Sequence, residues 1–113
     1  MSKVVITESF FRTLKSSCDQ HEASTILNLL RSLEENPRKG KALGHVAGIA
    51  IKELKHKKFR FFFITDGHML KFGTEDELAY LLIKFVRMSE KKDQQKTIDE
   101  IKRILKSLGF EGF

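Results

Sequence analysis

The segment KKFRFFFITDG, residues 57–67, is typical of a strand in the core of a β-sheet. Phenylalanine occupies positions 59, 61, 62 and 63, and aromatic side chains favour strands. Asp66-Gly67 is a turn signal at the end of this run. Arg60 conflicts with the pattern, because burying an unpaired guanidinium costs free energy. The arginine is therefore expected either to form a structural salt bridge or to project from the sheet into a site.

Strand alternation separates Arg60 from most of its aromatic neighbours. In a strand over 59–64, the odd positions share one face, and Arg60, Phe62 and Ile64 share the other. If the odd face packs on helices, Arg60 faces the opposite side, where Phe62 and Ile64 still need a cover. An amphipathic helix over 98–108 is the candidate for that cover. An ion pair from Arg60 to Glu53 across the hairpin is the structural alternative, and it is compatible with a site role.

Length and composition indicate one domain. The chain has 113 residues, with 41% hydrophobic and 32% charged residues, which is typical of a soluble globular protein. A single domain over 1–113 is expected. The sequence has no apolar run long enough for a signal peptide or a membrane span, so we expect a cytoplasmic protein. The one cysteine, Cys18, is expected to be a small buried hydrophobic residue.

The positive charge is concentrated in one segment. Residues 38–60 contain eight Lys or Arg and a single acid, so this segment carries a formal charge of +7, whereas the whole chain carries +6. The rest of the chain therefore sums to −1. A focused positive surface attracts polyanions, with nucleic-acid phosphates first among them, although a solvated lysine-rich face has the same composition.

The N-terminal third predicts a strand and two helices. Residues 4–6 are rich in β-formers, and Thr7 is a helix N-cap candidate. Asp19 and Glu22 resemble a capping box, and an i, i+3, i+4, i+7 apolar stripe follows at 26, 29, 30 and 33. Pro37 is expected to stop this helix near residue 36. The two helices should form a hairpin that buries one stripe against a sheet.

The remaining segments predict most of the sheet and a last helix. Residues 38–48 are interpreted as a flexible basic loop, and 49–58 as a strand joined to the 59–65 strand by a short basic turn. Residues 68–72 are expected to extend the hairpin or add a short strand. Residues 77–88 are expected to supply the last strand, with a helix as the alternative because of their Leu and Ala content. Ile98, Ile101, Leu105 and Leu108 form a helical stripe that ends at Gly109. The fold class is α+β, with a mainly antiparallel sheet of four or five strands.

Several kinds of site are not supported by any motif. The four histidines lack metal-ligand spacing, and Glu75, Asp76 and Glu77 are adjacent in an expected loop, so no metal is predicted. No glycine pattern predicts a nucleotide cradle, and no GxSxG motif occurs, so no cofactor is predicted. An enzyme with this sequence would use lysines and arginines, and phosphodiester chemistry is what such side chains promote.

Taken in order along the chain, these segments resemble the RelE/ParE superfamily of type II toxin–antitoxin systems. The resemblance rests on TESFFRTL (7–14), LEENPRKGKAL (33–43) and GIAIKELKHKKFRFFF (48–63). Family members show an Asn-Pro after the helical hairpin, a Gly-Lys-x-Leu loop, a strand ending in Glu-Leu-Arg and a strand starting Tyr-Arg. The later IKFVRMSEKKDQQKTIDEIKRI (83–104) is similar to the HigB-like branch.

The resemblance implies a twisted sheet with helices on one face and a basic concavity on the other. It also implies a toxin that cleaves mRNA on the ribosome without a metal and that is neutralised by a cognate antitoxin protein. In this chemistry the 2′-hydroxyl of the message attacks the adjacent phosphate, and basic side chains stabilise the charge that develops. The implied partners are the antitoxin, mRNA and the ribosome, with no membrane.

The resemblance also implies site residues. Arg60 matches the arginine that contacts the scissile phosphate, Lys55 stands at the position of the Glu-Leu-Arg arginine, and Lys52 precedes it on the same strand. Arg87 resembles a second phosphate-binding arginine, and His45 is a candidate acid or base with a surface loop residue as the alternative. The side chains expected to bind RNA are Arg38, Lys39, Lys41, Lys57, Lys58 and Lys84.

One departure keeps alternative functions open. Active RelE-like toxins usually carry a tyrosine or a His/Asp/Tyr group just after the last strand, where Ser89 and Glu90 stand here. The only tyrosine, Tyr80, precedes that strand. The alternatives are therefore a ParE-like toxin that inhibits DNA gyrase without being an enzyme, and an RNA-binding domain of the same fold with weak or no catalysis.

Overall fold

The strand β4 (Phe59–Asp66) lies in the middle of a five-stranded sheet with the order β1-β5-β4-β3-β2. The computed structural model describes residues 2–113. Its other strands are β1 (Lys3–Ile6), β2 (Lys41–Val46), β3 (Ile49–His56) and β5 (Leu82–Glu90). β1 pairs with β5 in parallel, and the remaining neighbours are antiparallel. The predicted α+β class and the mainly antiparallel sheet are confirmed.

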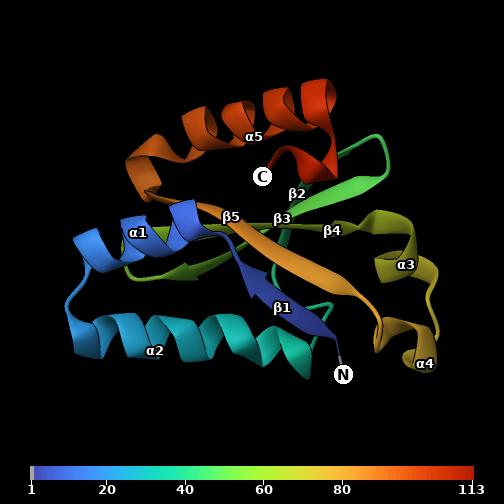
Figure 1. The fold of residues 1–113 in the computed structure, drawn as a ribbon, viewed down its shortest axis with the longest axis horizontal. Coiled ribbons are helices and arrows are strands. Elements are labelled where there is room, and N and C mark those ends of the chain that lie inside the picture. The colour runs from blue at the N-terminus through green and yellow to red at the C-terminus, as the bar shows by residue number, and fades with distance from the viewer. Residues whose placement is uncertain (1) are drawn as a thin grey trace.

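Helices cover both faces of this sheet, as Figure 1 shows. The longer helices are α1 (Glu8–Ser17), α2 (Gln20–Arg31) and α5 (Gln94–Leu108), and the short ones are α3 (Gly67–Phe72) and α4 (Glu75–Leu78). Single 3-10 turns are η1 (Ser32–Glu34), η2 (Lys91–Asp93) and η3 (Phe110–Gly112). α1 and α2 form the expected hairpin, α5 lies across the other face, and α3 and α4 lie beyond one end of the sheet.

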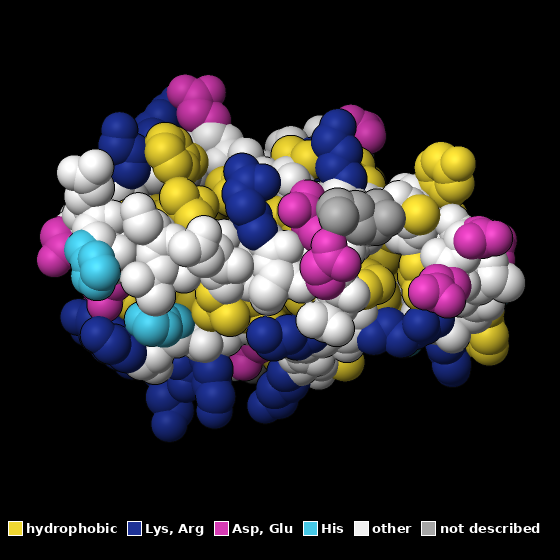
Figure 2. Space-filling model, turned by 90° about the horizontal axis from the view of Figure 1, so that it is seen from below, with side chains coloured by type: hydrophobic (Ala, Val, Ile, Leu, Met, Phe, Trp, Pro, Cys, Tyr) yellow, Lys and Arg dark blue, Asp and Glu magenta, His cyan; other side chains and the backbone are white. Residues whose placement is uncertain are grey.

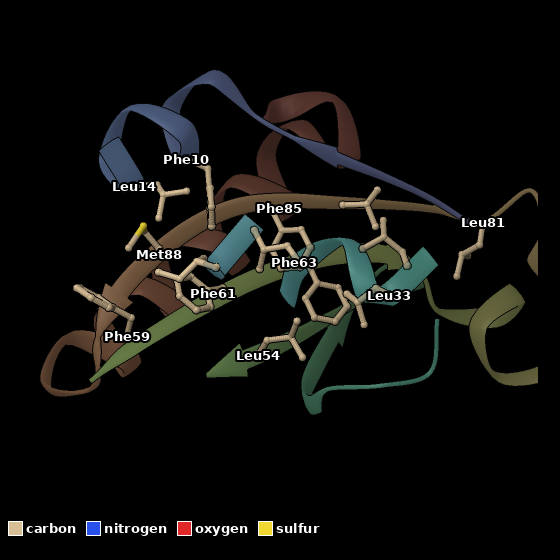
Figure 3. Close-up of a cluster of buried hydrophobic side chains, with 14 of the residues drawn as sticks. Phe10, Leu14, Leu33, Leu54, Phe59, Phe61, Phe63, Leu81, Phe85 and Met88 are labelled. Atoms are coloured by element: carbon tan, nitrogen blue, oxygen red, sulfur yellow. The ribbon is translucent and has the colours of Figure 1, made fainter. Parts of the chain in front are cut away.

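The two faces of β4 belong to two separate hydrophobic clusters. Phe59, Phe61 and Phe63 pack with α1 and α2 side chains such as Phe10 and Leu14, as Figure 3 shows. Phe62 and Ile64 pack on the opposite face against the stripe of α5 formed by Ile98, Ile101 and Leu105. The predicted division of odd and even positions is confirmed, and so is the α5 cover. Leu108 does not extend the stripe, since it is 67% exposed.

The helix starts follow the predicted capping. The Thr7 hydroxyl accepts a hydrogen bond from the Phe10 N–H, and the Asp19 carboxylate accepts one from the Glu22 N–H. The end of α2 differs from the prediction, because the α-helix stops at Arg31 and continues only as η1. The Ser32 hydroxyl donates to the Leu29 carbonyl at 2.6 Å, so the helix is closed before Pro37 is reached.

Three further segments differ from the sequence prediction. Residues 68–72 form α3 rather than a strand, because the Asp66 side chain accepts from the Met69 N–H and caps a helix directly after β4. Residues 41–46 form the edge strand β2 rather than a loop, paired with β3 through a bulge near Gly44. β5 starts only at Leu82 and includes Ser89 and Glu90, which therefore do not follow the strand.

Among residues 2–113, no helix is long and apolar enough to cross a membrane.

Replacing Phe62 by alanine is expected to lower the free energy of unfolding by about 3–5 kcal/mol, because it leaves a cavity between β4 and α5. Phe72→Ala is the matched control, since this phenylalanine on α3 is 65% exposed, and the change should stay within about 0.5 kcal/mol. Urea unfolding followed by circular dichroism measures both. Equal losses in the two variants would contradict the assignment of Phe62 to the second core.

Candidate nucleic-acid interface

The basic segment meets the N-terminus of α5 at an open edge of the sheet. β2 pairs with β3 only as far as Glu53, so the part of β3 that follows has no neighbouring strand on that side among the described residues. A cleft of about 490 Å³ lies there. Its lining comprises Leu29, Lys39, Gly40, Lys41, Glu53, Leu54, Lys55, Arg60, Lys91 and Gln94. We call this the basic cleft.

The cleft brings five cationic side chains together around one carboxylate. The cations are Lys39, Lys41, Lys55, Arg60 and Lys91, and the carboxylate is Glu53. Figure 2 shows Lys and Arg side chains gathered along the lower rim of the face seen there, whereas acidic side chains gather toward its right-hand end. Within residues 2–113, none of the five cations has a carboxylate oxygen within 4.0 Å. Their charge is therefore available to an anionic ligand.

Arg60 is held by the backbone rather than by an acid. Its Nη1 donates to the Lys57 carbonyl at 3.1 Å and to the Phe59 carbonyl at 3.0 Å. The side chain is only 9% exposed, yet the described part of the chain contains no fully buried side-chain nitrogen without a partner. The unbonded Nε and Nη2 must therefore reach solvent, and Arg60 lines the cleft. A guanidinium held at one nitrogen can still donate from the other two to an anion that enters the cleft.

The alternative of an Arg60–Glu53 ion pair is wrong. Glu53 lies opposite Phe62 in the β3–β4 register, whereas Arg60 lies opposite Lys55. The Glu53 Oε2 accepts instead from the Gln94 Nε2 of α5 at 2.6 Å. Glu53 is 5% exposed and its other oxygen has no protein partner, so that oxygen reaches the solvent of the cleft.

Lys55 and Arg60 form a like-charged pair directly across two strands. Such a pair destabilises a sheet, because the side chains leave the strands about 5 Å apart with the same charge. A phosphate between them would turn this repulsion into two attractions. Lys91 joins them because its N–H donates to the Lys58 carbonyl at 2.8 Å, which fixes η2 beside the β3–β4 turn.

Lys52 lies on the opposite face of β3 from Lys55. Strand alternation places it opposite Phe63, and its ammonium lies 5.9 Å from the centroid of that ring. The Nζ donates to the Arg38 carbonyl at 2.9 Å, and burial lowers the pKa of the Lys52 ammonium. Lys52 is not among the residues that line the cleft. Its contacts are those of an anchor for the 38–41 segment, which supplies Lys39 and Lys41.

Arg87 and His45 also lie outside the cleft. The Arg87 Nε donates to the Glu100 carboxylate of α5 at 2.9 Å, and its guanidinium lies over the Phe113 ring. These contacts direct it to the flank of α5 that faces β5. His45 is exposed and lies opposite Ala50 in the β2–β3 register, on the face of the sheet that carries α1 and α2. His45 is therefore on the opposite face of the sheet from Arg60, whereas Arg87 lies opposite Phe62 on the same face as Arg60 but pairs with Glu100.

The predicted RNA-binding residues divide between the cleft and other contacts. Lys39 and Lys41 line the cleft. Arg38 donates to the Leu70 and Gly73 carbonyls at the end of α3. Lys57 and Lys58 pair with Glu22 and Glu90. Lys84 lies over the Phe110 ring, 5.0 Å from its centroid, on the C-terminal side of α5.

Sequence reasoning did not identify Glu53, Lys91 or Gln94 as site residues. Glu53 had one signal, since it is the only acid within 38–60. Lys91 and Gln94 gave none, because only the course of the chain after β5 places them beside β3. Cys18 is partly buried, and burial raises the pKa of its thiol, which disfavours a nucleophilic role. In residues 2–113, no three His, Cys, Asp or Glu side chains are grouped so as to hold a metal ion.

No protein-family model, no curated protein and no solved structure matches this chain.

Lys52→Met and Lys55→Met are expected to have different effects, because Lys52 anchors the 38–41 segment and Lys55 lines the basic cleft. Lys52→Met removes the hydrogen bond to the Arg38 carbonyl and should cost about 1–2 kcal/mol of stability. Lys55→Met removes an exposed charge and should leave stability within about 0.5 kcal/mol, while weakening binding of single-stranded RNA. Thermal unfolding and a fluorescent RNA titration measure the two effects. Loss of RNA binding in Lys52→Met with unchanged stability would show direct contact instead.

The affinity for single-stranded RNA is expected to depend steeply on salt. If the five cleft cations each contact a phosphate, a plot of log K against log salt concentration should have a slope of about −3.5. Lys55→Met should reduce the magnitude of that slope by about 0.7. Lys57→Met is the matched control, since Lys57 pairs with Glu22 outside the cleft, and its slope should remain close to that of the parent.

Proposed function

We propose that this protein is a toxin of a type II toxin–antitoxin system that acts in the cytoplasm as a metal-independent endonuclease on ribosome-bound mRNA. The proposal rests on the resemblance of its sequence motifs to the RelE/ParE superfamily. One observation supports it above the others: the basic cleft places a backbone-fixed arginine and four lysines around a carboxylate with one oxygen open to solvent.

This set of groups can perform the three tasks of an in-line attack by a 2′-hydroxyl. A base must take the 2′ proton, cations must neutralise the pentacoordinate phosphate, and an acid must protonate the leaving 5′-oxygen. Glu53 is the carboxylate available as base. Arg60 and Lys55 are the cations nearest each other across the strands, and Lys91 is the further ammonium on that side.

The proposed reaction balances with these groups alone. The 2′-oxygen forms a bond to phosphorus as Glu53 accepts its proton, and the bond from phosphorus to the 5′-oxygen breaks. An ammonium of the cleft donates a proton to that oxygen. The products are a 2′,3′-cyclic phosphate and a 5′-hydroxyl. The Gln94 side chain positions the carboxylate through its 2.6 Å hydrogen bond.

A ParE-like inhibitor of DNA gyrase is the second candidate. No tyrosine lies among the residues of the cleft, because Tyr80 lies beyond the far end of β4 and is 85% exposed. Arg87 also forms an ion pair with Glu100. Both observations favour a cationic binding surface without catalysis. A domain that binds RNA and does not cleave it remains the third reading of the same cleft.

Induced expression in a bacterial host, with mapping of mRNA 5′ ends, distinguishes these functions. The mRNA endonuclease should arrest growth and produce new 5′ ends inside translated messages. Glu53→Gln keeps the hydrogen-bond acceptor for Gln94 but removes the base, so cleavage should fall by about 10²–10⁴-fold. Lys55→Met should also abolish toxicity, whereas Lys57→Met should not.

Other outcomes would decide against cleavage. A DNA-damage response without new 5′ ends would support the gyrase inhibitor. Normal growth at full expression, with RNA binding intact in a purified sample, would support the non-cleaving RNA-binding domain. Unchanged cleavage by Glu53→Gln would remove the carboxylate from the mechanism even if the cleft still cleaves RNA.

A further inference from the structure

The segment between β4 and β5 has a charge opposite to that of the whole protein. Residues 66–82 contain Asp66, Glu75, Asp76 and Glu77 but only one cation, Lys71, so the segment carries −3 in a chain of net charge +6. This segment forms α3 and α4 at the end of the sheet opposite the β3–β4 turn (Figure 1).

Within residues 2–113, the acids of this segment form no ion pair within 4.0 Å. The ion pairs among residues 2–113 use the carboxylates of Glu8, Glu22, Glu90 and Glu100. None involves a carboxylate of 66–82, although cations exceed acids by six in the sequence. The Asp66 carboxylate uses one oxygen, Oδ1, to cap α3 at the Met69 N–H. Its Oδ2 has no hydrogen-bond or ion-pair partner in the described part of the chain, residues 2–113.

An apolar hollow lies beside Asp66, which is the one acid of this segment that lines it. Its volume is about 420 Å³, and it is lined by Asp66, Met69, Tyr80, Leu81, Leu82, Phe110 and Glu111. Tyr80 is 85% exposed and Leu82 38%, so the hollow has an apolar wall open to solvent. Asp66 and Glu111 are exposed carboxylates among its lining residues. We call this the acidic hollow.

We propose that the acidic hollow binds a basic, amphipathic segment of a partner protein. Charge complementarity selects this occupant. An apolar side chain of the segment fills the space beside Tyr80 and Leu82, and its Lys or Arg side chains pair with Asp66 and Glu111. A nucleic acid is repelled by the same carboxylates, and an acidic segment fits the basic cleft instead. Tyr80 has the character of an interface anchor, since it offers a large apolar ring and a hydroxyl.

This surface is separate from the basic cleft, and the proposal does not rest on the cleavage of RNA. The cleft residues Lys55 and Arg60 lie beside the β3–β4 turn, whereas Asp66 ends β4. The two lining sets share no residue. A partner in the hollow would therefore leave the cleft open.

The test uses the full chain and a fluorescent helical peptide of about 14 residues, built from leucine and lysine with the leucines on one face. The control peptide replaces each lysine by glutamate. Fluorescence anisotropy should show saturable binding of the lysine peptide and none of the glutamate peptide. Tyr80→Ser should weaken binding at least about tenfold. Phe11→Ser on α1, which changes a ring 41% exposed, should leave it unchanged.

Glu111→Gln supplies the electrostatic half of the test. It should weaken binding of the lysine peptide by about three- to fivefold at low salt and by less at high salt, because salt screens an exposed ion pair. Circular dichroism of each variant checks that the fold is kept.

Three results would overturn the proposal. The first is equal binding of the two peptides or no saturable binding of either. The second is lysine-peptide binding that Tyr80→Ser leaves unchanged, which places the peptide elsewhere. The third is a dimer in sedimentation velocity that Tyr80→Ser dissociates, which assigns the hollow to a second copy of the chain.

Discussion

Burial of both faces of β4 is the constraint on which the rest of the structure depends. Successive residues of β4 point to opposite faces of the sheet, and both faces are buried. Such a strand needs a layer of helices on each side of the sheet. The phenylalanines at odd positions of β4 pack against α1 and α2, and Phe62 and Ile64 pack against α5. Since β4 also pairs along both edges, every other element is placed relative to it. Arg60 belongs to the α5 face but lies next to the turn, beyond the apolar stripe of the helix.

The basic cleft exists because neither β2 nor the apolar stripe of α5 covers the ends of β3 and β4 near their turn. β2 meets β3 no further than Glu53, and the stripe of α5 starts only at Ile98. The ends of β3 and β4 near their turn are thus left without a strand or an apolar helix face. Charged residues tolerate this position, because they stay hydrated. Arg60 tolerates near-complete burial there by donating to two carbonyls, and its other nitrogens remain accessible.

The sequence predicted those features that depend on local periodicity. The alternation in 59–64, the caps at Thr7 and Asp19 and the stripe of α5 each follow from spacing within a few residues. The edge strand β2 and the helix α3 were not predicted, because a glycine-containing edge strand and a capped six-residue helix have weak local signals. Within the site, the sequence prediction grouped Lys52 with Lys55, whereas strand alternation places the two side chains on opposite faces of β3. The Arg87–Glu100 and Glu53–Gln94 contacts depend on where α5 crosses the sheet, which no local pattern encodes.

The distribution of charge along β4 strengthens the field of the basic cleft. Arg60 and Asp66 are six residues apart on one strand, which corresponds to about 20 Å at about 3.3 Å per residue. The Debye length at physiological ionic strength is about 8 Å, so the acids of 66–82 are screened from the cleft by more than two such lengths. The same four acids placed near Lys55 would neutralise its charge. Segregating them at the far end keeps a local positive potential that attracts polyanions, which the net charge alone would understate.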